Sequence, residues 1–238
     1  MIFGAILAGG VGSRMNIADV PKQFLPLGNK PIVIHTLEKF LLCTSFDKVY
    51  VGVHPSWISH MEDLIDKYIN SKAEKVCIVP GGEDRNSTIF NIVKSIEEDY
   101  GENEEDIIVT HDAVRPFVTL RIINDNIDAA LKYGACDTVI PATDTIVESK
   151  NGISITNIPI RSHMYQGQTP QSFKIAKLKK AYYDLSDEEK DILTDACNIL
   201  VKRKMYVHLV MGDPSNMKIT TVNDYKVAQA MVGGMAID

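Results

Sequence analysis

A glycine-rich segment close to the N-terminus carries the first residues that could do chemistry. It reads Leu7-Ala8-Gly9-Gly10-Val11-Gly12-Ser13-Arg14-Met15, and Pro21-Lys22-Gln23 follows shortly after it. Glycines at the end of a strand allow positive φ angles and let backbone N–H groups approach an oxyanion. Arg14 and Lys22 add two cations, each of which interacts with a phosphate charge at 4 Å by about 4 kcal/mol at an effective ε of ~20. This pattern predicts phosphate binding and stabilisation of the charge at an attacked phosphorus.

Two familiar glycine-rich motifs do not fit this segment. A dinucleotide-binding G-x-G-x-x-G motif needs a third glycine where Met15 stands, and an acid about 20 residues further on at the end of the next strand. That strand end carries Val53-His54 instead. A Walker A loop needs Gly-Lys followed by Ser or Thr, which the segment lacks. The sequence therefore argues against both a nicotinamide-dependent reductase and a P-loop NTPase.

Short apolar runs of strand length alternate with helical patterns over most of the chain. The expected strands are 2–7, 48–53, 75–79, 106–110 and 138–141, with a later one at 206–211. Helical spacing of apolar residues lies between the earlier strands, and this alternation predicts a mostly parallel sheet covered on both faces. The expected fold class is α/β, a Rossmann-like three-layer α/β/α sandwich. Ligands of such sheets bind beyond the carboxyl ends of the strands, which brings loops 8–15, 81–86 and 111–116 to one edge.

The regular alternation stops near residue 143. Residues 145–149 and 153–158 show two short strand patterns around Asn151-Gly152, a hairpin turn signal. We expect a single domain over residues 1–238 with a protruding β-arm at about 143–160. An isolated hairpin is marginally stable, so its apolar side chains need a surface to bury against; these are Ile146, Val147, Ile153 and Ile155. A two-fold partner is the commonest such surface, so the arm predicts a homodimer.

Composition narrows the class of protein. The 238 residues are 45% hydrophobic and 24% charged, with a mean hydropathy of -0.04, which indicates a folded, soluble chain. The sequence shows no signal-peptide pattern and no membrane span, so a cytoplasmic protein without a membrane partner is expected. The net charge of -6 comes from an acidic run at 97–106, and the lack of a broad basic face argues against nucleic acid as a partner. The four scattered cysteines are typical of a reducing compartment.

Several motifs together resemble a known family. The glycine-rich segment with Pro21-Lys22-Gln23 resembles the nucleotide-binding signature of the sugar-phosphate nucleotidyltransferases. Further motifs are similar to the branch of this family that makes CDP-alditols: His111-Asp112-Ala113-Val114-Arg115-Pro116, Gln168-Thr169-Pro170-Gln171, Thr194-Asp195-Ala196 and Asn216-x-Lys218-Ile219-Thr220. The resemblance runs in order from about residue 2 to 231, and it implies a fold of the nucleotide-diphospho-sugar transferase type.

Within that branch, the sequence looks most like the ribitol-5-phosphate cytidylyltransferases. The strings at 111–118 and 164–173 carry this likeness, whereas the 2-C-methyl-D-erythritol 4-phosphate enzymes more often have Ala where this chain has Val114. The resemblance implies transfer of CMP from CTP to D-ribitol 5-phosphate, giving CDP-ribitol and pyrophosphate for wall teichoic acid or a related cell-surface polymer. The alternative acceptor is the methylerythritol phosphate of isoprenoid synthesis. Tyr165, Gln166 and Gln168 are expected to contribute to the choice between the two.

The resemblance also implies roles for individual residues. Arg14 and Lys22 would be catalytic, stabilising charge on the α-phosphoryl group of CTP. The implied CTP-binding residues lie in three loops: Leu7, Ala8, Gly9, Gly10, Gly81, Gly82, Glu83, Asp84, Arg85, Asn86, Ser87 and Asp112. The implied residues for the alditol phosphate are Arg161 and Lys218, with Thr145 and Thr169 as further candidates. Mg²⁺ or another divalent cation would enter mainly through the CTP phosphates, with Asp112 as its protein ligand.

The implied reaction needs no protein base or nucleophile. A phosphate monoester has a second pKa near ~6 and is already ionised near pH 7. Positioning and charge stabilisation would therefore carry catalysis. A member of another class, a nucleotide-binding regulatory module without turnover, is expected to lack Arg14 or Lys22, and both residues are present.

Overall fold

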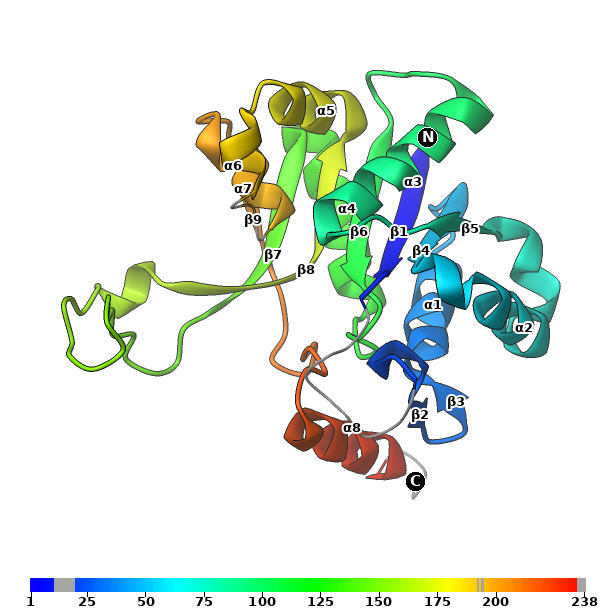
Figure 1. Cartoon of the computed structure of the whole chain (residues 1–238), viewed down its shortest axis with the longest axis horizontal. Helices are drawn as coiled ribbons and strands as arrows, with labels where there is room; N and C mark the ends of the chain where they lie inside the picture. The colour runs from blue at the N-terminus through cyan, green and yellow to red at the C-terminus, as the bar shows by residue number, and fades with distance from the viewer. Residues whose placement is uncertain (11–19, 192, 194, 235–238) are drawn as a thin grey trace.

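Seven strands form the central sheet of the protein in a computed structural model, which describes residues 1–10, 20–191, 193 and 195–234 (Figure 1). The strand order is β5-β4-β1-β6-β8-β7-β9. β8 runs antiparallel to both of its neighbours, while all other pairs are parallel, so the expected mostly parallel sheet is confirmed. The bounds are β1 Ile2–Ala8, β4 Lys48–Val53, β5 Val76–Pro80, β6 Ile107–Asp112, β7 Ala135–Pro141, β8 Tyr165–Lys174 and β9 His208–Met211.

Helices cover both faces of the sheet because successive strand residues point to opposite sides. Val49 and Val51 pack into one apolar core and Tyr50 between them packs into the other. The first core holds α1 Ile32–Leu42, α2 Ile58–Tyr68 and α4 Leu120–Tyr133. The second holds α3 Arg85–Tyr100, α5 Ile175–Tyr183 and α7 Ala196–Lys202. The predicted three-layer α/β/α sandwich is confirmed, and α6 Asp187–Asp191 joins α5 to α7.

A third, smaller core lies at the carboxyl-end edge of the sheet. It joins the short strand β2 Pro26–Leu27, which pairs with β3 Lys30–Pro31, to the last helix, α8 Val222–Gly234. Leu27, Ile219 and Ala228 are each completely buried in it. This core draws the segment between β9 and α8 across the edge of the sheet, where the predicted ligand loops end.

The segment between β7 and β8 projects away from the sheet as an arm (Figure 1). The two predicted strands of this arm, at 145–149 and 153–158, are wrong: its ladder is reduced to one isolated antiparallel bridge between Glu148 and Asn157. The side-chain oxygen of Asn151 accepts the N–H groups of Ile153 and Ser154, so these donors are used within the turn. Ile153 is 91% exposed, and an isolated hairpin without a covered face has little to stabilise a longer ladder.

Candidate functional site

A cleft of about 220 Å³ opens at the carboxyl ends of β1 and β6, beside the start of α3. It brings together many of the residues predicted from the sequence: Leu7, Ala8, Gly9, Gly10, Lys22, Gly82, Glu83, Asp84, Arg85, Asp112 and Lys218. Gln23, Thr88, Ala113 and Val114 also line it, although the sequence reasoning assigned them no role. Arg14, the other predicted catalytic cation, lies outside the described residues.

Gln23 holds the glycine-rich loop in place through two side-chain hydrogen bonds. Its side-chain Nε2 donates hydrogen bonds to the carbonyl oxygens of both Ala8 and Gly10, each at 2.8 Å. Gln23 is buried on the same 3-10 turn, Lys22–Phe24, that carries Lys22 into the cleft. Both bonds hold carbonyl groups, so they leave the amide groups of the loop available to a ligand. The sequence indicated this role only in that Gln23 directly follows Lys22 in the Pro21-Lys22-Gln23 motif.

Close packing between two loops explains the glycines at Gly9 and Gly81. A Cβ atom at Gly81 would lie 3.3 Å from the Cα of Gly9 and 3.3 Å from the backbone of Val53. A Cβ atom at Gly9 would lie 3.2 Å from the hydroxyl of Thr88. Glycine at both positions therefore lets the loops after β1 and β5 meet at the floor of the cleft. Gly81 itself does not line the cleft but supports Gly9, which does.

Asp84 and Ser87 form a capping box at the start of α3. The Asp84 carboxylate accepts the N–H of Ser87 at 2.7 Å, and the Ser87 hydroxyl accepts the N–H of Asp84 at 2.9 Å. Thr88 Oγ1 accepts the N–H of Gly82 at 3.0 Å and so ties the preceding loop to the helix. Of these predicted CTP-binding residues, Asp84 lines the cleft, whereas Ser87 and the buried Asn86 do not. The box holds the α3 N-terminus, with its partial positive charge, toward the cleft.

Asp112 lies buried in the cleft and faces three cations. Its carboxylate oxygens lie 2.8 Å from Nζ of Lys218, 3.4 Å from Nε of Arg85 and 3.6 Å from Nε of Arg115. Burial by itself raises the pKa of Asp112, but the charges of these three partners outweigh it and hold the pKa below its usual range. The carboxylate therefore stays ionised. The lining of the cleft holds three cations, Lys22, Arg85 and Lys218, and three carboxylates, Glu83, Asp84 and Asp112, and the pairing of Arg115 with Asp112 adds a fourth cation.

His111 and Thr169 lie beneath Asp112 and take no part in lining the cleft. The Thr169 hydroxyl accepts the backbone N–H of Asp112 at 3.2 Å and lies 2.9 Å from Nδ1 of His111. Burial lowers the pKa of His111 to about 4, so the imidazole is neutral at physiological pH. Thr169, a predicted substrate-binding residue, thus supports the end of β6 from inside the fold.

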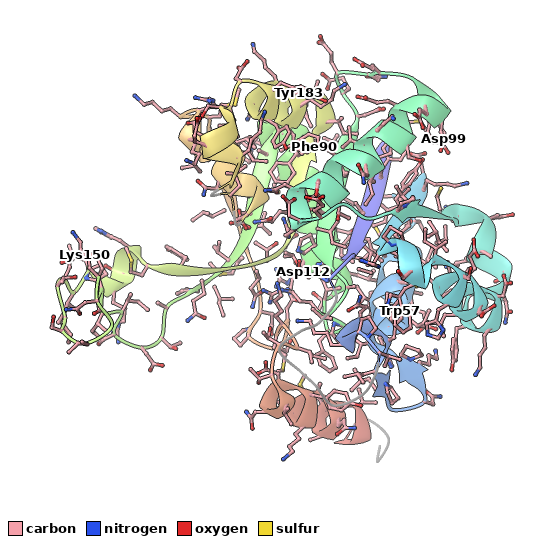
Figure 2. All side chains as sticks on the ribbon, viewed as in Figure 1. Trp57, Phe90, Asp99, Asp112, Lys150 and Tyr183 are labelled. Carbon is pink, nitrogen blue, oxygen red and sulfur yellow. The ribbon has the colours of Figure 1, made fainter. Side chains whose placement is uncertain are left out.

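Two further predicted residues for the alditol phosphate lie on the arm, outside the cleft. Arg161 is exposed, and its Nη1 donates a hydrogen bond to the carbonyl of Thr143 at 3.2 Å. Thr145 is exposed as well. Figure 2 shows Lys150 at the end of this arm, well separated from Asp112. Arg161 and Lys218 were predicted to bind the same phosphate, but within one chain only Lys218 lines the cleft.

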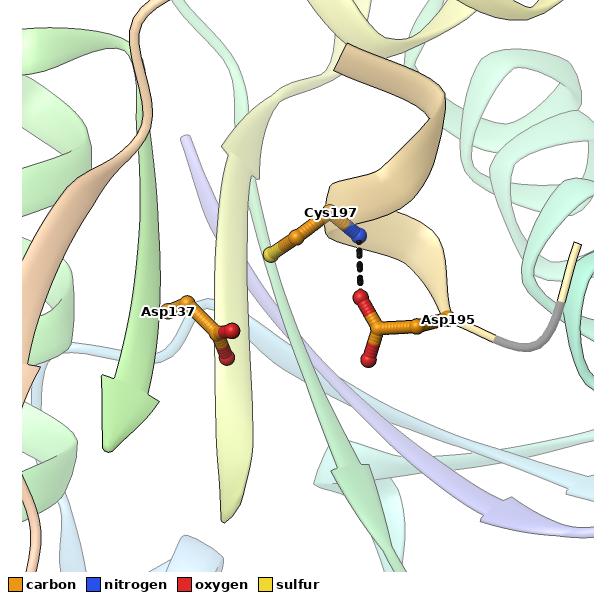
Figure 3. Close-up of side chains that lie close together, drawn as sticks. All are labelled: Asp137, Asp195 and Cys197. Carbon is orange, nitrogen blue, oxygen red and sulfur yellow. Dashed lines mark hydrogen bonds between the residues drawn. The ribbon is translucent and has the colours of Figure 1, made fainter. Parts of the chain in front are cut away.

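A second group of acidic and sulfur side chains lies behind the cleft, formed by Asp137, Asp195 and Cys197 (Figure 3). Their possible metal-ligand atoms lie within 4.8 Å of one another. Protein donors already engage both carboxylates, because Gln171 Nε2 donates to Asp137 at 3.0 Å and to Asp195 at 2.6 Å. Asp195 also accepts the N–H of Cys197 at 2.8 Å and caps α7. These contacts give the Gln-Thr-Pro-Gln and Thr-Asp-Ala motifs a common structural role.

The buried carboxyl group of Asp137 makes the stability of the fold depend on pH, and this dependence can be measured. Burial raises its pKa to about 7 from the usual 3.8, and the charge of Asp195 adds to this rise, which the hydrogen bond from Gln171 partly opposes. Between about pH 4 and pH 7 the folded protein holds a proton on Asp137 that the unfolded chain has lost. The contribution of this group to stability is therefore greatest at low pH and is lost as the pH rises through 7.

We expect Asp137→Asn to remove this dependence, since the amide is neutral and keeps an oxygen to accept from Gln171. Asp137→Asn should have a higher free energy of unfolding than the wild type. We expect this difference to be larger at pH 8 than at pH 5 by roughly 1–3 kcal/mol. Urea unfolding at both pH values measures this difference. Asp128→Asn on the exposed side of α4 controls for the loss of one charge. Parallel pH dependence in Asp137→Asn and the wild type would contradict the assignment.

The chain is similar to known cytidylyltransferases over almost its whole length. The family model of 2-C-methyl-D-erythritol 4-phosphate cytidylyltransferase, IspD, matches residues 2–234. The chain is 55% identical over 232 residues to a ribitol-5-phosphate cytidylyltransferase of Streptococcus pneumoniae (strain ATCC 700669 / Spain 23F-1). That match covers 98% of this chain and 99% of the relative.

Solved structures agree with the observed architecture. The 4-diphosphocytidyl-2C-methyl-D-erythritol synthase of Anaerococcus prevotii superposes with a TM-score of 0.79 at 22% identity, over 98% of each chain. The 2-C-methyl-D-erythritol 4-phosphate cytidylyltransferase of Francisella tularensis gives a TM-score of 0.78 at 26% identity, over 96% of this chain and 98% of that one. The first of these likenesses bears on the fold alone.

Proposed function

Because the chain belongs to the 2-C-methyl-D-erythritol 4-phosphate cytidylyltransferase family and is therefore a nucleotidyltransferase, we propose that it transfers CMP from CTP to D-ribitol 5-phosphate. The products are CDP-ribitol and pyrophosphate. The observation that carries this choice of acceptor is the 55% identity to a ribitol-5-phosphate cytidylyltransferase over nearly the whole of both chains. The cleft supports the CTP half of the reaction, because it joins a glycine-rich loop to several cations.

The alternative acceptor is 2-C-methyl-D-erythritol 4-phosphate. The matching family model carries that name, as do the structural neighbours. The identity to the two neighbours described above is 22% and 26%, less than half of the 55% found for the ribitol relative. A non-catalytic regulatory module is disfavoured because Lys22 is retained and lines the cleft.

The described residues suit an in-line displacement at the α-phosphorus of CTP. The ionised phosphate of the acceptor attacks, a new P–O bond forms, and the bond to pyrophosphate breaks. The backbone N–H groups of residues 7–10 donate hydrogen bonds to phosphate oxygens. Lys22 and Arg14 stabilise the charge that develops at the α-phosphoryl group. No histidine is among the described residues that line the cleft, and His111 beneath it is buried and bonded to Thr169, so it is not placed to act as a base.

Arg85 is the strongest described candidate for a further nucleotide contact. Its Nε faces Asp112, while Nη1 and Nη2 are buried and find no acceptor among the described residues. Buried guanidinium groups without acceptors are costly, so a ligand oxygen at this place stabilises the arrangement. Gly82, Glu83 and Asp84 of the same loop line the cleft and add backbone groups that can bind the edge of a pyrimidine.

A divalent cation, which we infer to be Mg²⁺, fits the same place. Mg²⁺ in nucleotide sites binds one or two carboxylates together with substrate phosphates. Asp112 is buried and ionised, and a metal ion there would replace part of its pairing with Lys218, Arg85 and Arg115. The carboxylate of Asp84 is used by the capping box of α3. Asp112 would hold the cation, and when bound the cation would neutralise charge on the triphosphate and the leaving pyrophosphate.

The arm supports the proposal of a homodimer. Five of its apolar side chains are between 50% and 91% exposed: Val147, Ile153, Ile155, Ile158 and Ile160. Exposed apolar groups concentrated on one projection favour burial against another protein surface. Since Arg161 lies on this projection and Lys218 lies in the cleft, both can hold one acceptor phosphate if the arm reaches the cleft of a second copy.

The acceptor proposal predicts a clear preference in kinetics. We expect kcat/KM for D-ribitol 5-phosphate to exceed that for 2-C-methyl-D-erythritol 4-phosphate by at least about 100-fold. A site that hydrogen-bonds an additional hydroxyl group rejects an analogue lacking it strongly, whereas a methyl group changes binding by only about 1–3 kcal/mol. Pyrophosphate release at saturating CTP with each acceptor measures the ratio. Faster turnover of the methylerythritol phosphate would overturn the proposal.

Gln168 does not have the position expected of a polyol-binding residue. It is 6% exposed, and both ends of its side-chain amide are used, by the carbonyl of Asp213 and by the amide of Asn216. Tyr165 and Gln166, at the exposed start of β8, remain candidates for contacts with the acceptor.

We propose that the CDP-ribitol supplies wall teichoic acid or a related cell-surface polymer, and that it is made in the cytoplasm. The four cysteines have no disulfide partners, as is usual in a reducing compartment. Among the described helices, none is both long and apolar enough to cross a bilayer.

A further inference from the structure

The segment of residues 212–219, which we call the rim strap, carries Lys218 across the edge of the cleft. Lys218 is a long, partly exposed side chain, and the position of its ammonium group depends on how the strap is held. We propose that Asn216 is a positioning residue that sets Lys218 against Asp112 and the acceptor phosphate. This inference rests on the proposed function and adds a residue to which the sequence reasoning assigned no role.

The side chain of Asn216 joins the rim strap to β8. Asn216 is fully buried, and its Nδ2 donates to the carbonyl of Thr169 at 2.8 Å and to Oε1 of Gln168 at 3.2 Å. Gln168 in turn donates to the carbonyl of Asp213 at 2.9 Å, at the other end of the same turn. The Oδ1 atom of Asn216 has no partner among the described residues. The side-chain amide of Asn216 therefore contributes to the fold as a hydrogen-bond donor, through its Nδ2 atom.

The main chain of Asn216 continues this connection to Asp112. Its carbonyl accepts a hydrogen bond from Arg115 Nη1 at 2.7 Å, and Arg115 pairs with the Asp112 carboxylate. The N–H of Asp112 is in turn bonded to the Thr169 hydroxyl. These hydrogen bonds and the ion pair form a closed ring that ties the ends of β6 and β8 to the rim strap. The members of the ring are Asn216, Arg115, Asp112 and Thr169.

Lys218 stands between two fixed points of the strap. Asn216 anchors the chain two residues before it, and the N–H of Ile219 donates to the carbonyl of Val114 at 2.9 Å directly after it. Two residues span at most about 7 Å, so a displaced Asn216 moves the Lys218 backbone as well. Loss of the Asn216 donors should therefore act on the reaction through Lys218, and not only on the stability of the fold.

A double-mutant cycle between Asn216 and Lys218 tests this inference. Asn216→Asp keeps the size of the side chain and removes both donated hydrogen bonds. We expect it to raise KM for D-ribitol 5-phosphate about tenfold, with a smaller change in KM for CTP. Lys218→Ala is expected to raise the same KM by about 10–100-fold. If Asn216 acts through Lys218, the double variant will be no worse than Lys218→Ala alone, within about twofold.

Asn126→Asp provides the matched control. Asn126 is another fully buried asparagine, and its Nδ2 donates to the Ile122 carbonyl and to the Thr138 hydroxyl, away from the cleft. It should lower the unfolding temperature without raising KM for the acceptor. If Asn216→Asp does not fold, Asn216→Ser, which keeps a hydroxyl donor in a smaller volume, enters the same cycle.

The outcomes separate this inference from the proposed function. A wild-type protein without activity on D-ribitol 5-phosphate overturns the proposed function. An active wild type in which the effects of Asn216→Asp and Lys218→Ala multiply overturns the positioning role alone, as does an unchanged KM in Asn216→Asp. Non-additive effects with a raised acceptor KM support the role.

Discussion

Replacement of Lys22 by alanine is expected to lower kcat by about 10²–10³, the range that follows the loss of one preorganised group stabilising a transition-state charge. Lys22 enters the cleft from the turn that Gln23 bonds to the glycine-rich loop, so the backbone that carries Lys22 is held beside that loop. Charge accumulates on the α-phosphoryl group in the transition state more than in bound CTP. The effect should therefore fall on turnover, with the Kd for CTP changing much less.

Pre-steady-state pyrophosphate release and calorimetry with CTP measure these two quantities. Lys22→Arg, which keeps the positive charge, is expected to recover part of the lost rate. Lys94→Ala removes an exposed lysine from α3, outside the cleft, and should leave kcat unchanged. Arg14→Ala is expected to behave like Lys22→Ala. Near-normal turnover in Lys22→Ala would remove the central claim about this cleft.

Mixing two inactive variants is expected to restore activity if the arm serves the cleft of a partner. In a heterodimer of Lys22→Ala and Arg161→Ala chains, one cleft carries both substitutions and the other carries neither. Random pairing makes half of the dimers mixed, so about a quarter of the wild-type activity should return. The separation between the arm and the cleft within one chain is the observation behind this expectation.

The matched control combines Lys22→Ala with Lys218→Ala, which both lie in the cleft. Every cleft in that mixture lacks one of the two lysines, so no recovery is expected. The chains must be refolded together or co-expressed to allow exchange, and sedimentation should show a dimer in each case. Absence of recovery with Arg161→Ala, in a verified mixed dimer, would show that Arg161 does not act across the dimer.

Local sequence patterns determined the layers of the fold and the edge that holds the cleft. The apolar runs at 48–53 and 106–110 became the buried strands β4 and β6 because β-branched residues fit a sheet covered on both faces. Since parallel strands end at a common edge, the loops after them could be placed together without knowledge of any side-chain contact. Gly81 was informative because its close approach is to the backbone of Gly9 and Val53, whereas the space at Gly9 is also limited by the side chain of Thr88.

Only the tertiary structure decided which side chains meet. Asp112 is paired with Lys218 and Arg115, Gln168 turns inward to the rim strap, and Asn216 closes a ring between three segments. The arm lost most of its expected ladder because no segment of the chain that the structure describes covers its apolar side chains. Sequence periodicity reports burial and local backbone preference. The partner of a buried polar group instead depends on donors and acceptors that distant segments bring within about 3 Å, and no local pattern encodes that distance.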